Sequence, residues 1–156
     1  MPADPTPAVG WKLVVDCADP HAQTAFWSQA LGYVTEEHGA LIDQLLSAGQ
    51  ITEDLTLTTP DGGRAWRALA AVRHPEDPVQ DFTGIGLGRR LLFQQVPEPK
   101  QGKNRLHIDL HFGPEGRDAA VTRLEGLGAK VLREVQEPGT HHVTMADPEG
   151  NEFCVQ

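Results

Sequence analysis

The sequence predicts an α+β protein made of two copies of one strand–helix–strands unit. Strand-like alternation followed by a helical segment occurs near both ends of the chain, and both helical segments end in Leu-Gly. An offset of 95 residues lays the first strand on the later one, so that Lys12 falls on His107. Such internal duplication predicts a single domain with two equivalent halves whose polar strand faces line a cleft.

The first unit begins with a strand over residues 11–17, in which apolar and polar side chains alternate. Asp19 is then placed as a helix N-cap and Pro20 at the first helical position. Gly32 predicts a left-handed end of that helix. We expect both Trp11 and Trp27 in or near the core.

The second unit repeats this order from residue 106 onward. Its first strand, residues 106–112, carries His107, Asp109 and His111 on one polar face. The helix ends at Gly128, and three strands follow at 129–135, 141–146 and 151–155. His141 and His142 are adjacent, so we expect only one of them to face the cleft.

The first unit holds about 36 residues that the second lacks. They predict a helix at 38–48, a strand at 66–72 and an acidic, proline-rich loop at 74–81. The glycines between residues 84 and 88 lack the spacing of a phosphate-binding loop and predict a flexible turn. A strand at 91–96 closes the unit.

These boundaries divide the chain into an N-terminal arm and one domain with two modules. The arm covers 1–10 and the domain 11–156, with module one at 11–100, its insertion at about 36–88, and module two at 103–156.

The charge and the apolar content of the chain limit the kinds of molecule that it is expected to bind. The net charge of −9 argues against nucleic acid, which needs clustered cations. No apolar run is long enough to span a membrane, and the first residues lack a secretory pattern, so we expect a cytoplasmic protein. The two cysteines are then free thiols. A phosphate site at Lys100, Lys103 and Arg105 is less favoured than a solvated loop.

Several motifs carry a resemblance to a known family. They are Asp19-Pro20, Phe26-Trp27, Leu31-Gly32-Tyr33, Phe93 to Lys100, Lys103 to Leu110, and Asp147 to Phe153. In this order they resemble the glyoxalase-like branch of the vicinal oxygen chelate superfamily, which includes glyoxalases, bleomycin-resistance proteins and extradiol dioxygenases. The resemblance implies two βαβββ modules forming curved mixed sheets around a cleft, with helices on the outer faces, and a homodimer.

The resemblance also implies where a metal would be bound. Metal-dependent members take four ligands, which fall by position on Lys12, Gln94, His107 and Cys154. Only His107 is a usual ligand, and protonated Lys12 cannot coordinate a cation. We therefore expect no cofactor, with one divalent metal near His107 as the alternative.

The polar strand faces and their flanking aromatics predict the ligand-binding residues. These are Lys12, Val14, Asp16, Trp66, Gln94, His107, Asp109, Glu152 and Cys154. A structural role remains open for each: Lys12 could pair with Asp16 or Asp109, and Cys154 could be a small buried filler.

The expected function is to hold a small organic ligand in the inter-module cleft without metal, as antibiotic-resistance proteins of this kind do. Whether the chain is an enzyme stays open. A metal-free lyase or isomerase would use His107 as acid–base catalyst and Lys12 to stabilise an enolate. Two further hypotheses are a metal-dependent glyoxalase or dioxygenase and a purely structural partner protein.

Overall fold

The computed structural model describes residues 6–156, and residues 1–5 of the expected N-terminal arm lie outside the described part of the chain. Module one contains β1 (Leu13–Cys17), α1 (Pro20–Leu31), β2 (Val34–Thr35), α2 (Gly39–Ser47), the 3-10 helix η1 (Glu53–Leu55), β3 (Thr56–Thr58), β4 (Arg64–Trp66), β5 (Leu69–Arg73) and β6 (Arg90–Gln95). Module two contains β7 (Asp109–Leu110), α3 (Gly113–Gly126), β8 (Lys130–Glu137), β9 (Thr140–Ala146) and β10 (Glu152–Val155).

Each module has a four-stranded mixed sheet. The strand orders are β1-β6-β5-β2 in module one and β7-β10-β9-β8 in module two. In both sheets the first strand lies parallel to the last, and the other pairs are antiparallel. The predicted α+β class is confirmed. No helix within residues 6–156 has the length and apolar character needed to cross a bilayer.

Helix α1 forms as its sequence predicts. The Asp19 carboxylate accepts hydrogen bonds from the backbone N–H groups of His21 and Ala22, and Pro20 occupies the first turn. Gly32 ends the helix with φ of 69°, a left-handed conformation in which a side chain would be strained.

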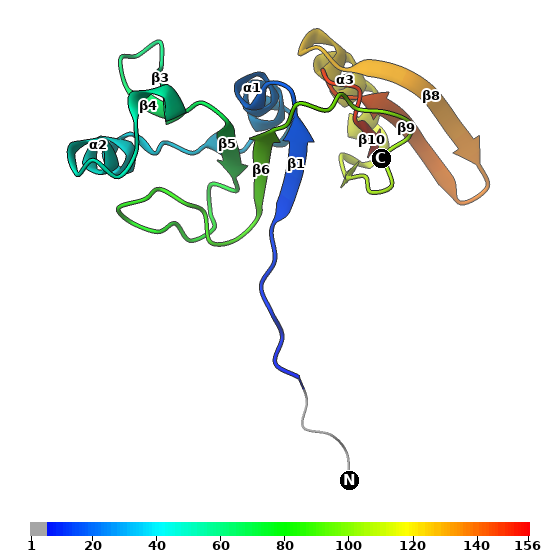
Figure 1. Ribbon diagram of the computed structural model, residues 1–156. Coiled ribbons are helices and arrows are strands. Elements are labelled where there is room, and N and C mark those ends of the chain that lie inside the picture. The colour runs from blue at the N-terminus through cyan, green and yellow to red at the C-terminus, as the bar shows by residue number, and fades with distance from the viewer. Residues whose placement is uncertain (1–5) are drawn as a thin grey trace.

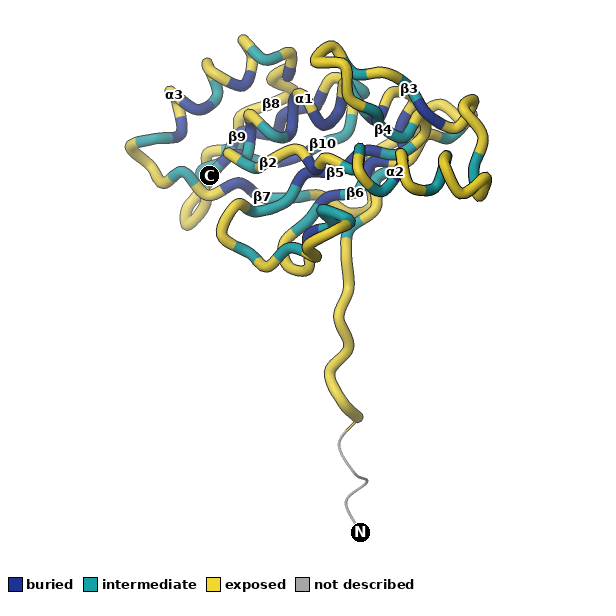
Figure 2. Tube along the Cα trace, turned by 90° about the vertical axis from the view of Figure 1, so that its left-hand side faces the viewer, coloured by how far each residue is buried: buried dark blue, intermediate teal, exposed yellow. Residues whose placement is uncertain are grey.

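The two modules share one hydrophobic core. Figure 2 shows α1 and α3 on the same side of the sheets, with buried positions on the faces turned toward the strands. Phe26 and Trp27 of α1 pack on Phe153 of β10, with ring centroids 6.2 and 5.1 Å apart. The core placement of Trp27 is thus confirmed, and burial of this aromatic cluster contributes strongly to module association.

Trp11 is not a core residue, and that expectation is wrong. Its exposed fraction is 84%. The strand begins two residues later, at Leu13, so Trp11 lies on the segment that leaves the body of the protein (Figure 1). The alternation of apolar and polar residues in the sequence thus begins two residues before the first residue of β1.

The turn between β9 and β10 ties module two to α1. Buried Asp147 accepts hydrogen bonds from Gln23 Nε2 at 2.8 Å and from Trp27 Nε1 at 3.1 Å. Its other oxygen accepts from the backbone N–H groups of Glu149 and Asn151, which closes the turn. One carboxylate therefore orders the turn and joins the two modules.

Glu149 of the same turn caps the start of α1 from outside. Its carboxylate accepts hydrogen bonds from the backbone N–H groups of Ala18 at 2.6 Å and Asp19 at 3.0 Å. Negative charge at a helix N-terminus is stabilising because it faces unpaired N–H groups. The Asp-Pro-Glu-Gly-Asn motif thus has a structural role in this chain.

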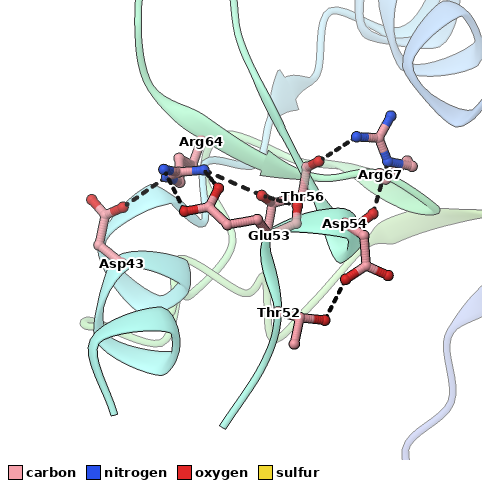
Figure 3. A network of polar contacts seen from close by, with 7 residues as sticks. All are labelled: Asp43, Thr52, Glu53, Asp54, Thr56, Arg64 and Arg67. Atoms are coloured by element: carbon pink, nitrogen blue, oxygen red, sulfur yellow. Dashed lines mark hydrogen bonds and ion pairs between the residues drawn. The ribbon is translucent and has the colours of Figure 1, made fainter. Parts of the chain in front are cut away.

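The insertion is a small subdomain held by two arginines (Figure 3). Arg64 on β4 contacts Glu53 at 2.6 Å and Asp43 on α2 at 3.6 Å. Arg67 donates to the backbone carbonyls of Asp54 and Thr56. The helix predicted at 38–48 is confirmed as α2.

The strand predicted at 66–72 is instead two strands, β4 and β5. They pair with different partners, β3 and β6, so the chain changes direction between them at residues 67 and 68. There the backbone N–H of Arg67 donates to the carbonyl of Leu55 in η1. The change of direction lets β4 pair with β3 inside the insertion while β5 pairs with β6 in the main sheet. The periodicity of the sequence does not reveal this break.

A buried ion pair fastens the loop at residues 74–89 to β2 and β6. Glu36 accepts two hydrogen bonds from Arg90 at 2.7 and 2.8 Å and one from the Gly86 N–H. His38 Nε2 lies 3.2 Å from Glu36, and His38 Nδ1 lies 2.7 Å from the Thr83 carbonyl. Both ring nitrogens therefore face acceptors, which only the protonated imidazole satisfies.

The glycines of this loop allow it to approach closely. A Cβ at Gly84 would lie 2.5 Å from the Glu37 carbonyl oxygen, and Gly84 has φ of 72°. The segment that the sequence predicts as a flexible turn is therefore a close-packed contact that needs glycine.

Replacing Asp147 by Ala should lower the free energy of unfolding by about 3 kcal/mol, because two buried donors on α1 lose their acceptor. Urea denaturation measures this. Asp118→Ala, on an exposed side chain of α3 that is 91% accessible, is the matched control and should change stability little. Equal effects of the two substitutions would contradict the role of Asp147 in joining the two modules.

The His38 site predicts a pH dependence. The hydrogen bond to Glu36 raises the pKa of His38 although burial opposes it, so its contribution to stability is full below the unfolded pKa and declines as pH rises through the folded pKa. For Glu36, burial opposes ionisation, but His38, Arg90 and the Gly86 N–H together lower the pKa to about 2. Glu36 thus stabilises at all pH values above its unfolded pKa and loses that contribution only in acid.

We therefore expect the stability difference between wild type and His38→Gln to be largest near pH 6 and to shrink toward pH 9. Urea unfolding at several pH values measures it. His111→Gln, at an exposed histidine, is the control and should follow wild type. A difference that does not change with pH would refute a protonated His38.

Candidate functional site

The polar face of the module-two sheet forms a pocket of about 310 Å³. Its lining residues are Lys103, His107, Asp109, Arg133, Thr140, His142, Thr144, Glu152, Phe153, Cys154 and Gln156. Four of the residues predicted to bind ligand, His107, Asp109, Glu152 and Cys154, lie together here. We call this hollow the module-two pocket.

Strand register explains why these side chains meet. Cys154 on β10 is paired with Asp109 on β7 and with Thr144 on β9, so all three project from the same side of the sheet. On β9, His142 faces the pocket. His141 faces the other way, 2.7 Å from both Arg117 and Glu134, as its adjacency to His142 predicts.

His107 and Asp109 form a hydrogen-bonded pair. His107 Nδ1 lies 3.1 Å from Asp109 Oδ1, and Gln156 Nε2 donates to Asp109 Oδ2 at 3.2 Å. The His107 side chain is 45% exposed. A carboxylate orients the ring while its second nitrogen stays available, an arrangement able to exchange a proton with a bound molecule.

Glu152 is already paired within the protein. It accepts from the Asn104 N–H at 3.0 Å and lies 3.4 Å from Lys100 Nζ. Burial opposes ionisation of this carboxyl, but the Asn104 hydrogen bond and Lys100 outweigh it, so the pKa of Glu152 is lowered. Glu152 is therefore a charged wall of the pocket rather than a proton donor.

Cys154 is half-buried, and its thiol contacts the Thr144 hydroxyl at 3.8 Å. Burial raises the pKa of Cys154, which favours the neutral thiol near neutral pH. One donor atom each from His107, Asp109 and Cys154 lie within 4.8 Å of one another. By type, this nitrogen, oxygen and sulfur set fits Zn²⁺, provided the thiol is deprotonated on binding.

The module-one candidates lie elsewhere in the protomer. Lys12 lines a hollow of about 680 Å³ beside Trp11 and Tyr33, and Trp66 lines one of about 360 Å³ beneath the insertion. Asp16 on β1 is paired with Gln94 on β6.

Val14, Asp16 and Gln94 line none of these three hollows. Within residues 6–156, Lys12 makes no ion pair with Asp16 or Asp109. Within one protomer, Lys12 therefore lies outside the pocket that holds His107 and Cys154.

Several lining residues escaped the sequence analysis. They are Lys103 as a pocket residue, Arg133, Thr140, Thr144, Phe153 and Gln156, and for the pair His141 and His142 the sequence did not say which one faces the pocket. The alternation of Thr140, His142 and Thr144 along β9 was the available signal, because residues two apart share a strand face. No such signal existed for Arg133, since its direction depends on a β-bulge.

Comparison with known proteins agrees with this fold. A family model described as a glyoxalase-like domain matches residues 12–156. No curated protein matches the sequence significantly.

Three solved structures illustrate the similarity. The fosfomycin resistance protein FosX from Mesorhizobium loti has a TM-score of 0.59 and 10% identity, over 97% of this chain and 92% of that one. A glyoxalase/bleomycin resistance protein/dioxygenase family enzyme from Burkholderia phytofirmans has a TM-score of 0.56 and 14% identity, over 92% and 94%.

A mutant of FosX from Listeria monocytogenes, in complex with Mn(II) and dihydroxypropylphosphonic acid, has a TM-score of 0.57 and 10% identity, over 97% and 90%. At these identities the structures show a shared fold alone. With the family model spanning nearly the whole sequence, the chain belongs to the glyoxalase-like domain family of the vicinal oxygen chelate superfamily.

Proposed function

We propose that this protein binds a small organic molecule in the module-two pocket, without a metal, as a glyoxalase/bleomycin-resistance-like binding protein. The observation that carries the proposal is the convergence of His107, Asp109, Glu152 and Cys154 on one hollow of about 310 Å³. Pockets of this size with a few oriented polar groups are typical of small-molecule sites.

Sequestering a drug or metabolite needs oriented contacts but no turnover. Asp109 and Glu152 are held by partners inside the protein, so the pocket is ordered before a ligand arrives. Preorganised polar groups lower the entropic cost of binding. The free thiols of Cys17 and Cys154 suit a reducing compartment, in keeping with a cytoplasmic location.

A metal-dependent glyoxalase or dioxygenase is the second candidate. The donor atoms of His107, Asp109 and Cys154, within 4.8 Å of one another, favour it. A divalent ion held there would act as a Lewis acid toward a bound oxygen. Asp109 would also keep the His107 ring oriented, as carboxylates do for metal-bound histidines.

A lyase or isomerase without metal is the third candidate, supported by the His107–Asp109 hydrogen bond. Asp109 would hold the ring so that His107 Nε2 exchanges the proton. In this candidate Lys12 stabilises developing negative charge, and a second copy of the chain must bring it to the pocket.

We also propose a homodimer in which module one of one protomer covers the module-two pocket of the other. This would unite Lys12 with His107, which one protomer keeps apart. Trp11 and Leu106 support it, because each precedes the edge strand of its module, at corresponding repeat positions, and they are 84% and 77% exposed. Large exposed apolar side chains of this kind mark association surfaces.

Thermal-shift screening with polycyclic natural products should find stabilising ligands, because ligand at 100 times Kd stabilises the folded state by about 2.7 kcal/mol. His107→Ala should remove most of the shift, whereas His111→Ala, at an exposed residue outside the pocket, should keep it. For a compound that the wild type does not convert, a shift that persists in His107→Ala would refute this pocket as the site.

The same assay separates the three candidates. Binding that survives dialysis against EDTA supports the metal-free receptor, and its loss with recovery on adding Zn²⁺ supports the metal site. Conversion of the bound compound, abolished in His107→Ala while binding remains, supports the lyase or isomerase.

Sedimentation equilibrium should give twice the 17.0 kDa mass of one chain. Trp11→Asp should shift the protein toward the monomer, because a charge would then be buried in the interface. Leu55→Asp, at a 48% exposed position in the insertion, is the control and should leave the dimer intact. A monomeric wild type would contradict the shared site.

A further inference from the structure

We propose that the ligand of the module-two pocket is an organic anion, and that Arg133 together with Lys103 holds its carboxylate or phosphate-type oxyanion. This inference rests on the proposed function, since it names the chemistry of the molecule that the same pocket takes. It follows from which charges in the pocket are already paired and which are not.

The acidic groups of the pocket are occupied. Asp109 is engaged by His107 and Gln156, at 3.1 and 3.2 Å. Glu152 is engaged by the Asn104 N–H and by Lys100. The ammonium group of an organic ligand would have to displace these partners, so the carboxylates are poor anchors for one.

The basic groups are free by comparison. Within residues 6–156, the Arg133 guanidinium makes no hydrogen bond or ion pair. Lys103 Nζ has one contact, 3.4 Å from the carbonyl oxygen of neighbouring Asn104. A guanidinium and an ammonium at one hollow form a site for an oxyanion, which guanidinium can bind through two parallel hydrogen bonds.

A β-bulge directs Arg133 into the pocket. Lys130 and Val131 on β8 pair with Ala146 and Met145, and continuing that register would place Arg133 opposite buried Val143. The register shifts after Val131, so Arg133 instead lies opposite Thr144, on the pocket face. Bulges commonly re-aim a side chain beside a functional site.

The hydroxyl groups of Thr140 and Thr144 also line the pocket. Thr144 lies between Arg133 on β8 and Cys154 on β10, and the hydroxyl of Thr140 contacts His142 at 3.2 Å. Hydroxyl donors beside a guanidinium add directional contacts to an oxyanion. Because the whole chain carries a net charge of −9, these local groups must overcome a field that repels anions.

Titration of the labelled protein by NMR tests the proposal with four matched probes. Benzoate and phenyl phosphate are anionic, benzyl alcohol is neutral and benzylamine is cationic. We expect both anions to bind about tenfold more tightly than the alcohol, to shift the amide signals of Thr144 and Cys154, and to weaken as salt is added. The tighter of the two anions identifies the preferred oxyanion.

Arg133→Gln should weaken the anions about tenfold and leave benzyl alcohol unchanged, and Arg133→Lys should recover part of the loss. Arg105→Gln removes an equal charge from an exposed residue outside the pocket and should change binding less than twofold. Equal binding of all probes, an unaffected Arg133→Gln protein, or no binding of either anion would overturn the inference. Neutral natural products that still stabilise the protein through His107 would then leave the proposed function standing.

Discussion

The buried carboxylate of Asp147 is the interaction on which the arrangement of the two modules depends. It stands in the turn between β9 and β10, yet two of its hydrogen-bond donors, the side chains of Gln23 and Trp27, belong to α1 of the other module. A buried charge without partners is costly, so any relative movement of the modules must break these hydrogen bonds together. Because Trp27 also packs against Phe153, the polar contact and the aromatic core resist the same displacement.

This constraint fixes where the two polar sheet faces lie. With α1 and α3 packed into a common core, the opposite face of each sheet is left for the site or for a partner (Figure 2). The positions related by the repeat, Lys12 and His107, therefore line different hollows of one protomer. The internal duplication that makes the fold recognisable also distributes the expected site over two surfaces.

The sequence predicted most of the fold because its signals are local. Asp19, Gly32 and the strand alternation each act within a few residues, and each was confirmed. Prediction failed where distant contacts decide. Trp11 continues the alternation but precedes the paired strand, and the strand predicted at 106–112 pairs with β10 only at Asp109 and Leu110. For the site, period-two spacing placed His107 and Asp109 on one face, and the family resemblance brought Cys154 to them. Neither could place Arg133, whose direction follows from a bulge.

The difference between positions fixed by strand register and a position set by a bulge also affects ligand specificity. Residues at the repeat-related strand positions are constrained by register, since a one-residue slip would turn His107 and Cys154 into the core. Arg133 is free of that constraint, because β8, one strand of the long β8–β9 hairpin (Figure 1), contributes no described residue to the shared core. Under the proposed role of Arg133, a change in the bulge would alter which charge the pocket selects, while the hydrogen bonds of Asp147 keep the two modules in place.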